Sequence, residues 1–172
     1  MNLTPQAMMI ITAVFGGSFL LMIPFAIMNS KRKKKEAAYV SQNTQKAILH
    51  LYATSPVIDG AKINKIEHVR GADLQYTVAL APGSHNISAK YSCASVGLAK
   101  NVNYSTPKPI ESEISLEAGH EYTLAIYFYS PEERYNYYEG DVGEAVYCQE
   151  LTLTGSGFGG FSRAYIICYQ EK

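Results

Sequence analysis

The chain has 172 residues, with 15 Lys and Arg against 15 Asp and Glu, 14 Tyr and no Trp. All of the acidic residues follow position 35, whereas five of the basic ones precede position 36. Residues 36–172 therefore carry 10 basic and 15 acidic side chains and a net charge of −5. A domain of that sign offers no positive surface to a phosphate backbone, so nucleic acid is not expected as a partner.

The first element in chain order is the apolar run Ala7–Met28, which contains no charged side chain. A helix of this length, rising about 1.5 Å per residue, is roughly 33 Å long and would cross a hydrocarbon core of about 30 Å. The run therefore predicts a single transmembrane helix and makes the lipid bilayer a partner. A cleavable signal peptide would carry its positive charge before the apolar run, not after it.

Small residues recur at four-residue spacing inside this run, and such spacing lets two helices approach closely. It predicts packing against transmembrane helices of other subunits. The alternative is a generic anchor that happens to contain glycines. The predicted helix-packing residues are Thr12, Ala13, Gly16 and Gly17.

A block of five basic residues follows the run: Lys31, Arg32, Lys33, Lys34 and Lys35. Because such clusters stay on the cytoplasmic side of a membrane, the block predicts the N-terminus outside and the C-terminal domain in the cytoplasm. The opposite topology, with an extracytoplasmic domain, is the alternative. The predicted organisation is a transmembrane anchor (1–30), a basic juxtamembrane stalk (31–45) and one domain (46–172).

The predicted domain consists of short apolar or alternating segments separated by Gly, Pro, Asn and Asp, and no segment shows helical periodicity. This pattern predicts an antiparallel β-sandwich of about eight strands behind a single N-terminal transmembrane α-helix. The expected strands are Ala47–Ala53, Ala61–Glu67, Leu74–Leu80, His85–Cys93, Ile110–Leu116, Glu121–Tyr129, Glu144–Leu153 and Phe161–Gln170.

Three turn segments suggest a family. They are Ile58-Asp59-Gly60, the Pro-Gly-x-His turn within Leu80–Ile87, and Ala118-Gly119-His120-Glu121-Tyr122. With these segments, residues 46–130 resemble small bacterial β-sandwich modules of the PEGA type and related transthyretin-like domains. The resemblance implies a scaffold without catalytic activity, and many modules of this kind lie outside the cytoplasm.

The segment Gly155–Gly160 has the G-x-G-x-x-G spacing of dinucleotide-binding loops. A predicted strand rather than a helix follows it, so there is no helix N-terminus to hold a pyrophosphate. The segment therefore predicts a hairpin connection and no cofactor. Its aromatic residues Phe158 and Phe161 are candidate contacts for a partner.

Histidine and cysteine are placed without an evident catalytic or metal-binding pattern. The sequence around them contains no nucleophile-elbow motif and no spacing typical of metal ligands. No enzyme activity and no bound metal are therefore expected. The histidines are His50, His68, His85 and His120. Cys93, Cys148 and Cys168 are read as small buried hydrophobes; an extracytoplasmic domain would instead allow a Cys148–Cys168 disulfide.

The segment Ser130–Gly143 combines tyrosines with acidic residues and is longer than most hairpin loops. Tyrosine provides a large contact area at low entropic cost, which is typical of binding surfaces. Tyr135, Tyr137 and Tyr138 are therefore the predicted partner contacts. The alternative is a solvated loop whose tyrosines pack back onto the sheet.

These features together predict a non-catalytic accessory or assembly subunit of a larger membrane protein complex, with other membrane-protein subunits as partners. The alternative is a membrane-tethered, extracytoplasmic module that binds a glycan or cell-wall polymer on exposed tyrosines.

Overall fold

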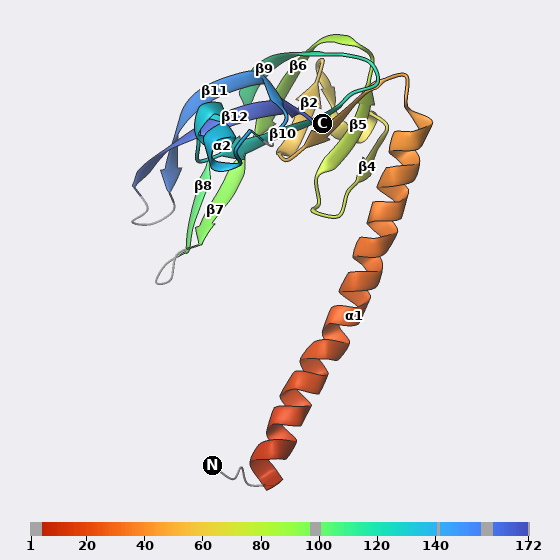
Figure 1. Cartoon of the computed structure of the whole chain (residues 1–172), viewed down its shortest axis with the longest axis vertical. Coiled ribbons are helices and arrows are strands. Elements are labelled where there is room, and N and C mark those ends of the chain that lie inside the picture. Colours follow the sequence, from red (N-terminus) through yellow and green to blue (C-terminus); the bar gives the residue numbers. More distant parts are fainter. Residues whose placement is uncertain (1–4, 97–100, 141, 156–159, 172) are drawn as a thin grey trace.

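The computed structural model describes the backbone of residues 5–96, 101–140, 142–155 and 160–171, and the side chains of these residues except 5–22, 95, 96 and 101. One long helix precedes a mostly β domain (Figure 1). In chain order the elements are α1 (Pro5–Gln42), β1 (Ala47–Leu51), β2 (Thr54–Ile58), β3 (Ala61–Lys62), the short 3₁₀ turn η1 (Ile63–Lys65), β4 (His68–Arg70), β5 (Tyr76–Leu80), β6 (Gly83–Lys90), β7 (Ser92–Val96), β8 (Asn101–Ser105), β9 (Ile110–Leu116), β10 (Glu121–Tyr127), α2 (Pro131–Tyr137), β11 (Glu144–Gly155) and β12 (Phe161–Gln170).

The helix α1 requires a correction of the sequence-based prediction. In the part of the chain that the structure describes, no helix is long and apolar enough to cross a membrane. From Ile23 to Gln42 the helix carries the basic block Lys31–Lys35 followed by Glu36, and such side chains are costly to place in hydrocarbon. This finding contradicts the predicted single-pass transmembrane helix, and with it the topology and localisation deduced from that helix.

The predicted helix-packing residues Thr12, Ala13, Gly16 and Gly17 lie outside the residues whose side chains are described. Helix α1 continues without a break through much of the predicted stalk to Gln42, and β1 begins at Ala47. The five residues of the basic block lie on α1 with exposed or half-exposed side chains.

The β domain is also not the predicted antiparallel sandwich of about eight strands. The described strands form an eight-stranded sheet in the order β4-β5-β1-β10-β12-β11-β8-β7 and a four-stranded sheet in the order β3-β2-β6-β9. Strands β1 and β10 pair in parallel, with Leu49 opposite Tyr122. The larger sheet curls, so that β7 and β8 project from one end of the domain and α1 leaves from the other (Figure 1).

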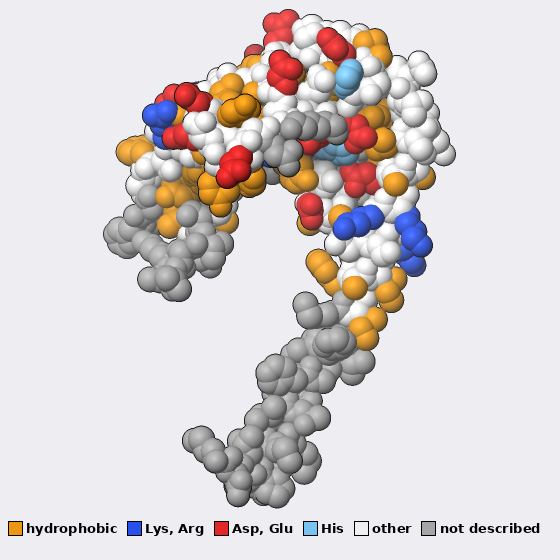
Figure 2. All heavy atoms as spheres, in the orientation of Figure 1, with side chains coloured by type: hydrophobic (Ala, Val, Ile, Leu, Met, Phe, Trp, Pro, Cys, Tyr) orange, Lys and Arg blue, Asp and Glu red, His pale blue; other side chains and the backbone are white. Residues whose placement is uncertain are grey.

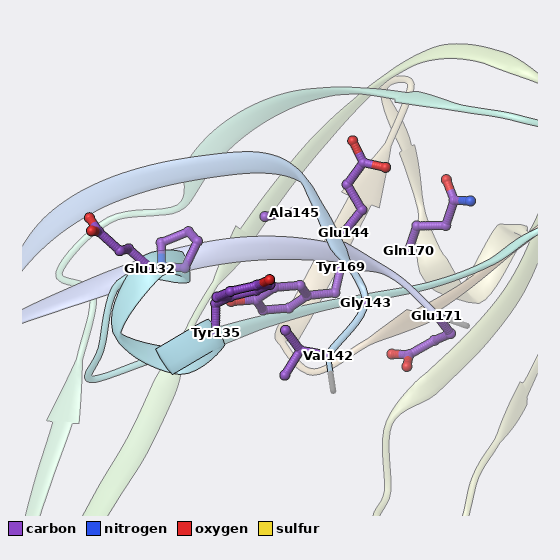
Figure 3. A pocket seen from close by; sticks show the side chains of 10 residues that line it. Glu132, Tyr135, Val142, Gly143, Glu144, Ala145, Tyr169, Gln170 and Glu171 are labelled. Carbon is purple, nitrogen blue, oxygen red and sulfur yellow. The ribbon is translucent and has the colours of Figure 1, made fainter. Parts of the chain in front are cut away.

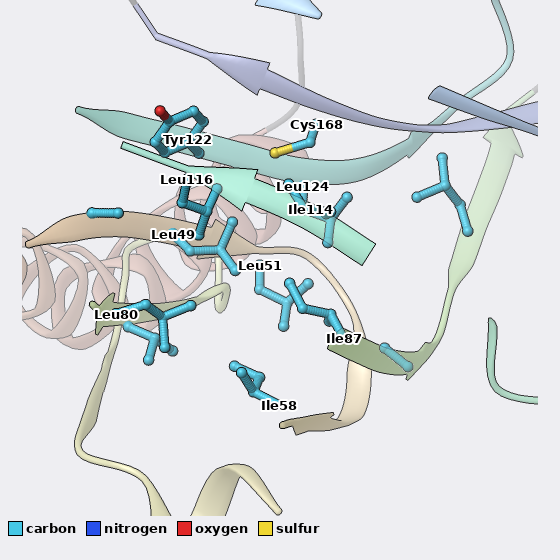
Figure 4. Close-up of a cluster of buried hydrophobic side chains, with 14 of the residues drawn as sticks. Leu49, Leu51, Ile58, Leu80, Ile87, Ile114, Leu116, Tyr122, Leu124 and Cys168 are labelled. Carbon is cyan, nitrogen blue, oxygen red and sulfur yellow. The ribbon is translucent and has the colours of Figure 1, made fainter. Parts of the chain in front are cut away.

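The main core lies between the two sheets, because alternate residues of each strand face inward. Strand β9 shows the pattern clearly, with Ser112, Ile114 and Leu116 buried and the residues between them exposed. Its neighbours in the core include Leu49 and Leu124 from the larger sheet (Figure 4). The alternation of β9 places its glutamates in solvent and its aliphatic side chains against the curled sheet.

A second, smaller cluster lies on the opposite face of the curled sheet. Tyr165, Ile167 and Tyr169 of β12 are buried there, packed with Tyr127 of β10 and Ala145 of β11. Because successive β12 residues point to opposite faces, Ile166 and Cys168 belong to the main core instead. This second face of β12 is the one on which α2 packs.

Candidate functional site

The segment predicted as a tyrosine-rich loop contains the short helix α2. The Ser130 hydroxyl accepts a hydrogen bond from the Glu133 N–H (3.1 Å), and the Glu133 carboxylate accepts one from the Ser130 N–H (2.7 Å). This reciprocal capping box, with Pro131 at the first helical position, stabilises the start of the helix. The hydrogen bonds from Ser130 lower the pKa of Glu133, which favours the charged carboxylate at the positive end of α2.

Arg134 attaches α2 to the sheet through aromatic rings. Its guanidinium carbon lies 4.2 Å from the ring centroid of Tyr169, 5.0 Å from that of Tyr127 and 5.8 Å from that of Tyr138. Burial raises the pKa of the Tyr127 hydroxyl to about 12 although Arg134 opposes the shift, so this phenol stays neutral. The helix is thus held by cation–π contacts to ring faces.

The three predicted tyrosines lie together on α2 and immediately after it. Tyr135 is 58%, Tyr137 78% and Tyr138 48% exposed, and the rings of Tyr137 and Tyr138 meet edge to face at 4.9 Å. Tyr129, also exposed, adjoins them. We call the exposed rings of Tyr129, Tyr135, Tyr137 and Tyr138 the α2 surface. The sequence left open whether these tyrosines are exposed or pack back onto the sheet, and the structure shows them exposed.

A pocket of about 430 Å³ opens within the α2 surface. Its walls combine aromatic rings with one carboxylate and the guanidinium of Arg134. The lining residues are Tyr129, Glu133, Arg134, Tyr137 and Tyr138. Arg134 attaches α2 to the sheet. The tyrosine rings that α2 exposes are therefore held in place in the absence of a partner.

The two predicted phenylalanine contacts are not part of this surface. Phe161 is 80% exposed but stands at the start of β12, four residues before Tyr165 along the strand. Phe158 lies outside the described residues. As predicted, the glycine-rich segment joins two antiparallel strands, with the Gly155 N–H donating to the Gly160 carbonyl (2.8 Å).

A second pocket of about 610 Å³ lies on the other side of α2, between the helix and the edge formed by the start of β11 and the end of β12. Figure 3 shows the rings of Tyr135 and Tyr169 in its middle, with Glu132 to one side and Glu144 and Glu171 to the other. Gly143 makes this geometry possible, because a Cβ there would lie 2.0 Å from the Gln170 carbonyl oxygen.

Sequence reasoning missed α2 and the residues around it: Glu132, Arg134, Glu144, Tyr169 and Glu171. A signal for the helix was present in Ser130-Pro131-Glu132-Glu133, since Ser with Glu three residues later is a capping box and proline favours the first helical turn. No local signal joins Glu144 and Glu171 to α2. The pairing of β11 with β12 brings them there.

A polar network attaches the C-terminal half of α1 to the larger sheet. The buried Thr77 hydroxyl (2.6 Å) and the Gln75 amide (3.0 Å) both donate to Glu36 Oε1. His50 lies between two carboxylates, its Nδ1 3.2 Å from Glu36 Oε1 and its Nε2 3.1 Å from Glu121 Oε2. These contacts hold the C-terminal half of α1 against the larger sheet, so we interpret the network as structural.

The remaining histidines have separate partners. His85 Nδ1 lies 2.7 Å from Asp59 Oδ2, and His120 contacts Glu117 and Gln170. Among the residues that the structure describes, no group of three or more His, Cys, Asp or Glu side chains could hold a metal ion.

The three cysteines are free thiols, and only one of them is fully buried. Cys168 faces the main core, whereas Cys148 is exposed and pairs in register with Ile167 rather than with Cys168. The disulfide considered for an extracytoplasmic domain is not formed.

In comparisons with known proteins, no family model, no curated protein and no solved structure matches this chain. The resemblance to PEGA-type and transthyretin-like modules therefore stays a prediction.

Proposed function

We propose that this chain is a non-catalytic assembly module that contacts a partner protein through the α2 surface. The observation that carries the proposal is the group of exposed tyrosine rings on a helix that a capping box and Arg134 hold in place. Tyrosine is enriched at the centres of protein interfaces, and contacts held in place beforehand lose little entropy on binding.

The position of the α2 surface supports this reading. The main core is complete without it, because the two sheets bury their aliphatic side chains against each other. The exposed rings of α2 thus add nothing to that core and are available to a second molecule. Exposed apolar patches of this kind are typical of interaction sites.

The proposal is tested by site-specific photo-cross-linking in native extracts. A benzophenone amino acid replaces Tyr137 in the full chain, and a matched chain carries it at the exposed Tyr52, away from α2. We expect a single protein species to form a one-to-one cross-linked adduct from position 137 and not from position 52. If neither the chain labelled at position 137 nor the one labelled at position 52 cross-links in extracts where the protein is folded, the proposal is contradicted.

A glycan is the second candidate ligand, because the 430 Å³ pocket combines tyrosine rings, on which a sugar can stack, with the hydrogen-bonding groups of Glu133 and Arg134. A glycan array with the purified chain distinguishes the two candidates. Binding to a defined oligosaccharide that is lost in a Tyr137→Ser variant would favour the glycan.

A further inference from the structure

The 610 Å³ pocket between α2 and the edge of β11 and β12 is distinct from the 430 Å³ pocket within the α2 surface. It has the size of a small-ligand site, so one large side chain would fill part of it. It is continuous with the α2 surface through Tyr135, which belongs to both. A partner that covers the α2 surface therefore also reaches this pocket.

The charge of the pocket is its first informative property. Three exposed carboxylates line it, from Glu132, Glu144 and Glu171, and no Lys or Arg is among its lining residues. Within the described part of the chain none of these three carboxylates forms an ion pair. Glu132 lies on α2, Glu144 begins β11 and Glu171 directly follows β12, so their proximity results from the fold and not from one acidic stretch of sequence.

The aromatic rings are the second property. Tyr169 is only 2% exposed and lines the pocket, and its buried hydroxyl has no hydrogen-bond partner in the described structure. Tyr135 adds a second, largely exposed ring. The exposed ring of Tyr135, with carboxylates on either side, favours a planar cation that stacks on this ring while its N–H groups reach the oxygens.

Arg134 also contacts the Tyr169 ring, at 4.2 Å, and its positive charge opposes a second cation nearby. Arg134 does not line this pocket, however, and three carboxylates outnumber its single charge. The charged side chains that line the pocket are therefore all negative. The whole of residues 36–172 has the same sign, with a net charge of −5, and Figure 2 shows acidic side chains distributed over the β domain.

We infer that this pocket accepts an arginine side chain of the partner protein. This inference rests on the proposed function, since the partner that covers the α2 surface presents the arginine. Arginine fits better than lysine because its guanidinium is planar, stacks on aromatic rings and donates two parallel hydrogen bonds to one carboxylate. The partner surface around that arginine is expected to be basic, complementary to the acidic pocket.

The test uses the full chain, ¹⁵N-labelled, and two synthetic peptides. Acetyl-Gly-Arg-Gly-amide is the probe, and the same peptide with citrulline, a neutral analogue of arginine with nearly the same shape, is its control. We expect the arginine peptide to shift the amide resonances of Glu144, Ala145 and Glu171 saturably, and more weakly at high salt. Equal shifts with citrulline, or shifts spread over the whole domain, would overturn the inference.

Charge variants supply the second arm. In one variant Glu132, Glu144 and Glu171 are changed to Gln. In the other, the change to Gln is made at three glutamates that are also exposed but do not line this pocket: Glu67, Glu111 and Glu117. Both lose three negative charges, so a general electrostatic effect would be the same in each. We expect at least tenfold weaker peptide binding in the first variant and less than a twofold change in the second. Equal weakening would overturn the inference.

The cross-linking assay from position 137 separates this inference from the proposed function. Unchanged cross-linking of the partner to the Glu132, Glu144 and Glu171 variant would overturn the arginine pocket and leave the α2 surface as the interface. Arginine-specific peptide binding without any cross-linked protein would support the pocket as a guanidinium site while contradicting the assembly function.

Discussion

The guanidinium carbon of Arg134 lies 4.2 Å from the ring centroid of Tyr169, and this contact joins helix α2 to the curled sheet. Both groups lack some expected hydrogen bonds, because Nε and Nη1 of Arg134 and the hydroxyl of Tyr169 are buried without partners. Burying these polar atoms without hydrogen bonds lowers the stability of the fold. Cation–π attraction of about 1–2 kcal/mol raises it, so the two contributions to global stability largely cancel.

The Arg134→Gln substitution is therefore expected to act locally. It removes the contacts to the Tyr127 and Tyr169 rings, and α2 should detach while the two-sheet core remains folded. We expect hydrogen exchange of the Tyr138 amide, which donates to the Arg134 carbonyl, to accelerate at least tenfold. Arg163→Gln is the control, because Arg163 is an exposed arginine that contacts Glu150 and Tyr165 on the sheet. Similar exchange in both variants would show that Arg134 does not hold α2.

The network around Glu36 predicts that α1 and the larger sheet are energetically coupled. Glu36→Ala leaves the buried Thr77 hydroxyl and the Gln75 amide without their carboxylate acceptor. We expect the free energy of unfolding, measured by urea denaturation with circular dichroism, to fall by about 1–3 kcal/mol. The neighbouring exposed Lys35→Ala should change it by less than about 0.5 kcal/mol. A similar small change for both variants would mean that the network contributes nothing to stability.

The pair Asp59 and His85 predicts a pH-dependent contribution to stability. Burial by itself lowers the pKa of His85, but hydrogen bonds to Asp59 and the Ala81 carbonyl outweigh it and raise the pKa above 6.5. Burial likewise raises the pKa of Asp59, and the hydrogen bonds from His85 and the Asn86 N–H outweigh it, leaving this pKa below 3.8.

A raised histidine pKa stabilises the fold fully below 6.5 and ceases to do so as pH rises through the raised value. A lowered aspartate pKa stabilises it above 3.8 and ceases to do so as pH falls through the lowered value. The pair is thus most stabilising between these two values. We expect Asp59→Asn, which tolerates the positive φ of this turn, to destabilise the chain most near pH 5 and least above pH 9. A pH-independent difference in urea denaturation would contradict the pairing.

The thiols are expected to differ widely in reactivity. Burial, with a smaller contribution from Glu171, raises the pKa of Cys168 to about 12, so almost no thiolate exists at pH 8. Cys148 is exposed and should react with iodoacetamide at least a hundredfold faster, as followed by mass spectrometry of tryptic peptides. In urea the two rates should become similar. Rapid labelling of Cys168 in the folded chain would indicate that the main core opens at β12.

Several strands could be predicted from the sequence because their signals are local. Alternation of apolar and polar residues correctly delimits Ile110–Leu116 and Phe161–Gln170. It missed β2, where Thr54–Ile58 contains a proline, and it merged β6 with the start of β7 across Tyr91. Helix α2 was missed although its capping box is local, because three tyrosines in an acidic segment were interpreted by composition alone.

The sequence by itself determined which segments alternate, where the turns occur, that negative charge is concentrated after position 35, and that tyrosines gather in Ser130–Gly143. Only the tertiary structure decided the parallel pairing of β1 with β10, the curl of the larger sheet and the position of α2 on its outer face. It also decided that Glu132, Glu144 and Glu171 share one pocket. The physical reason is that alternation and turn residues act over a few neighbours, whereas strand order and the meeting of distant side chains depend on how the sheets pack to bury their common core.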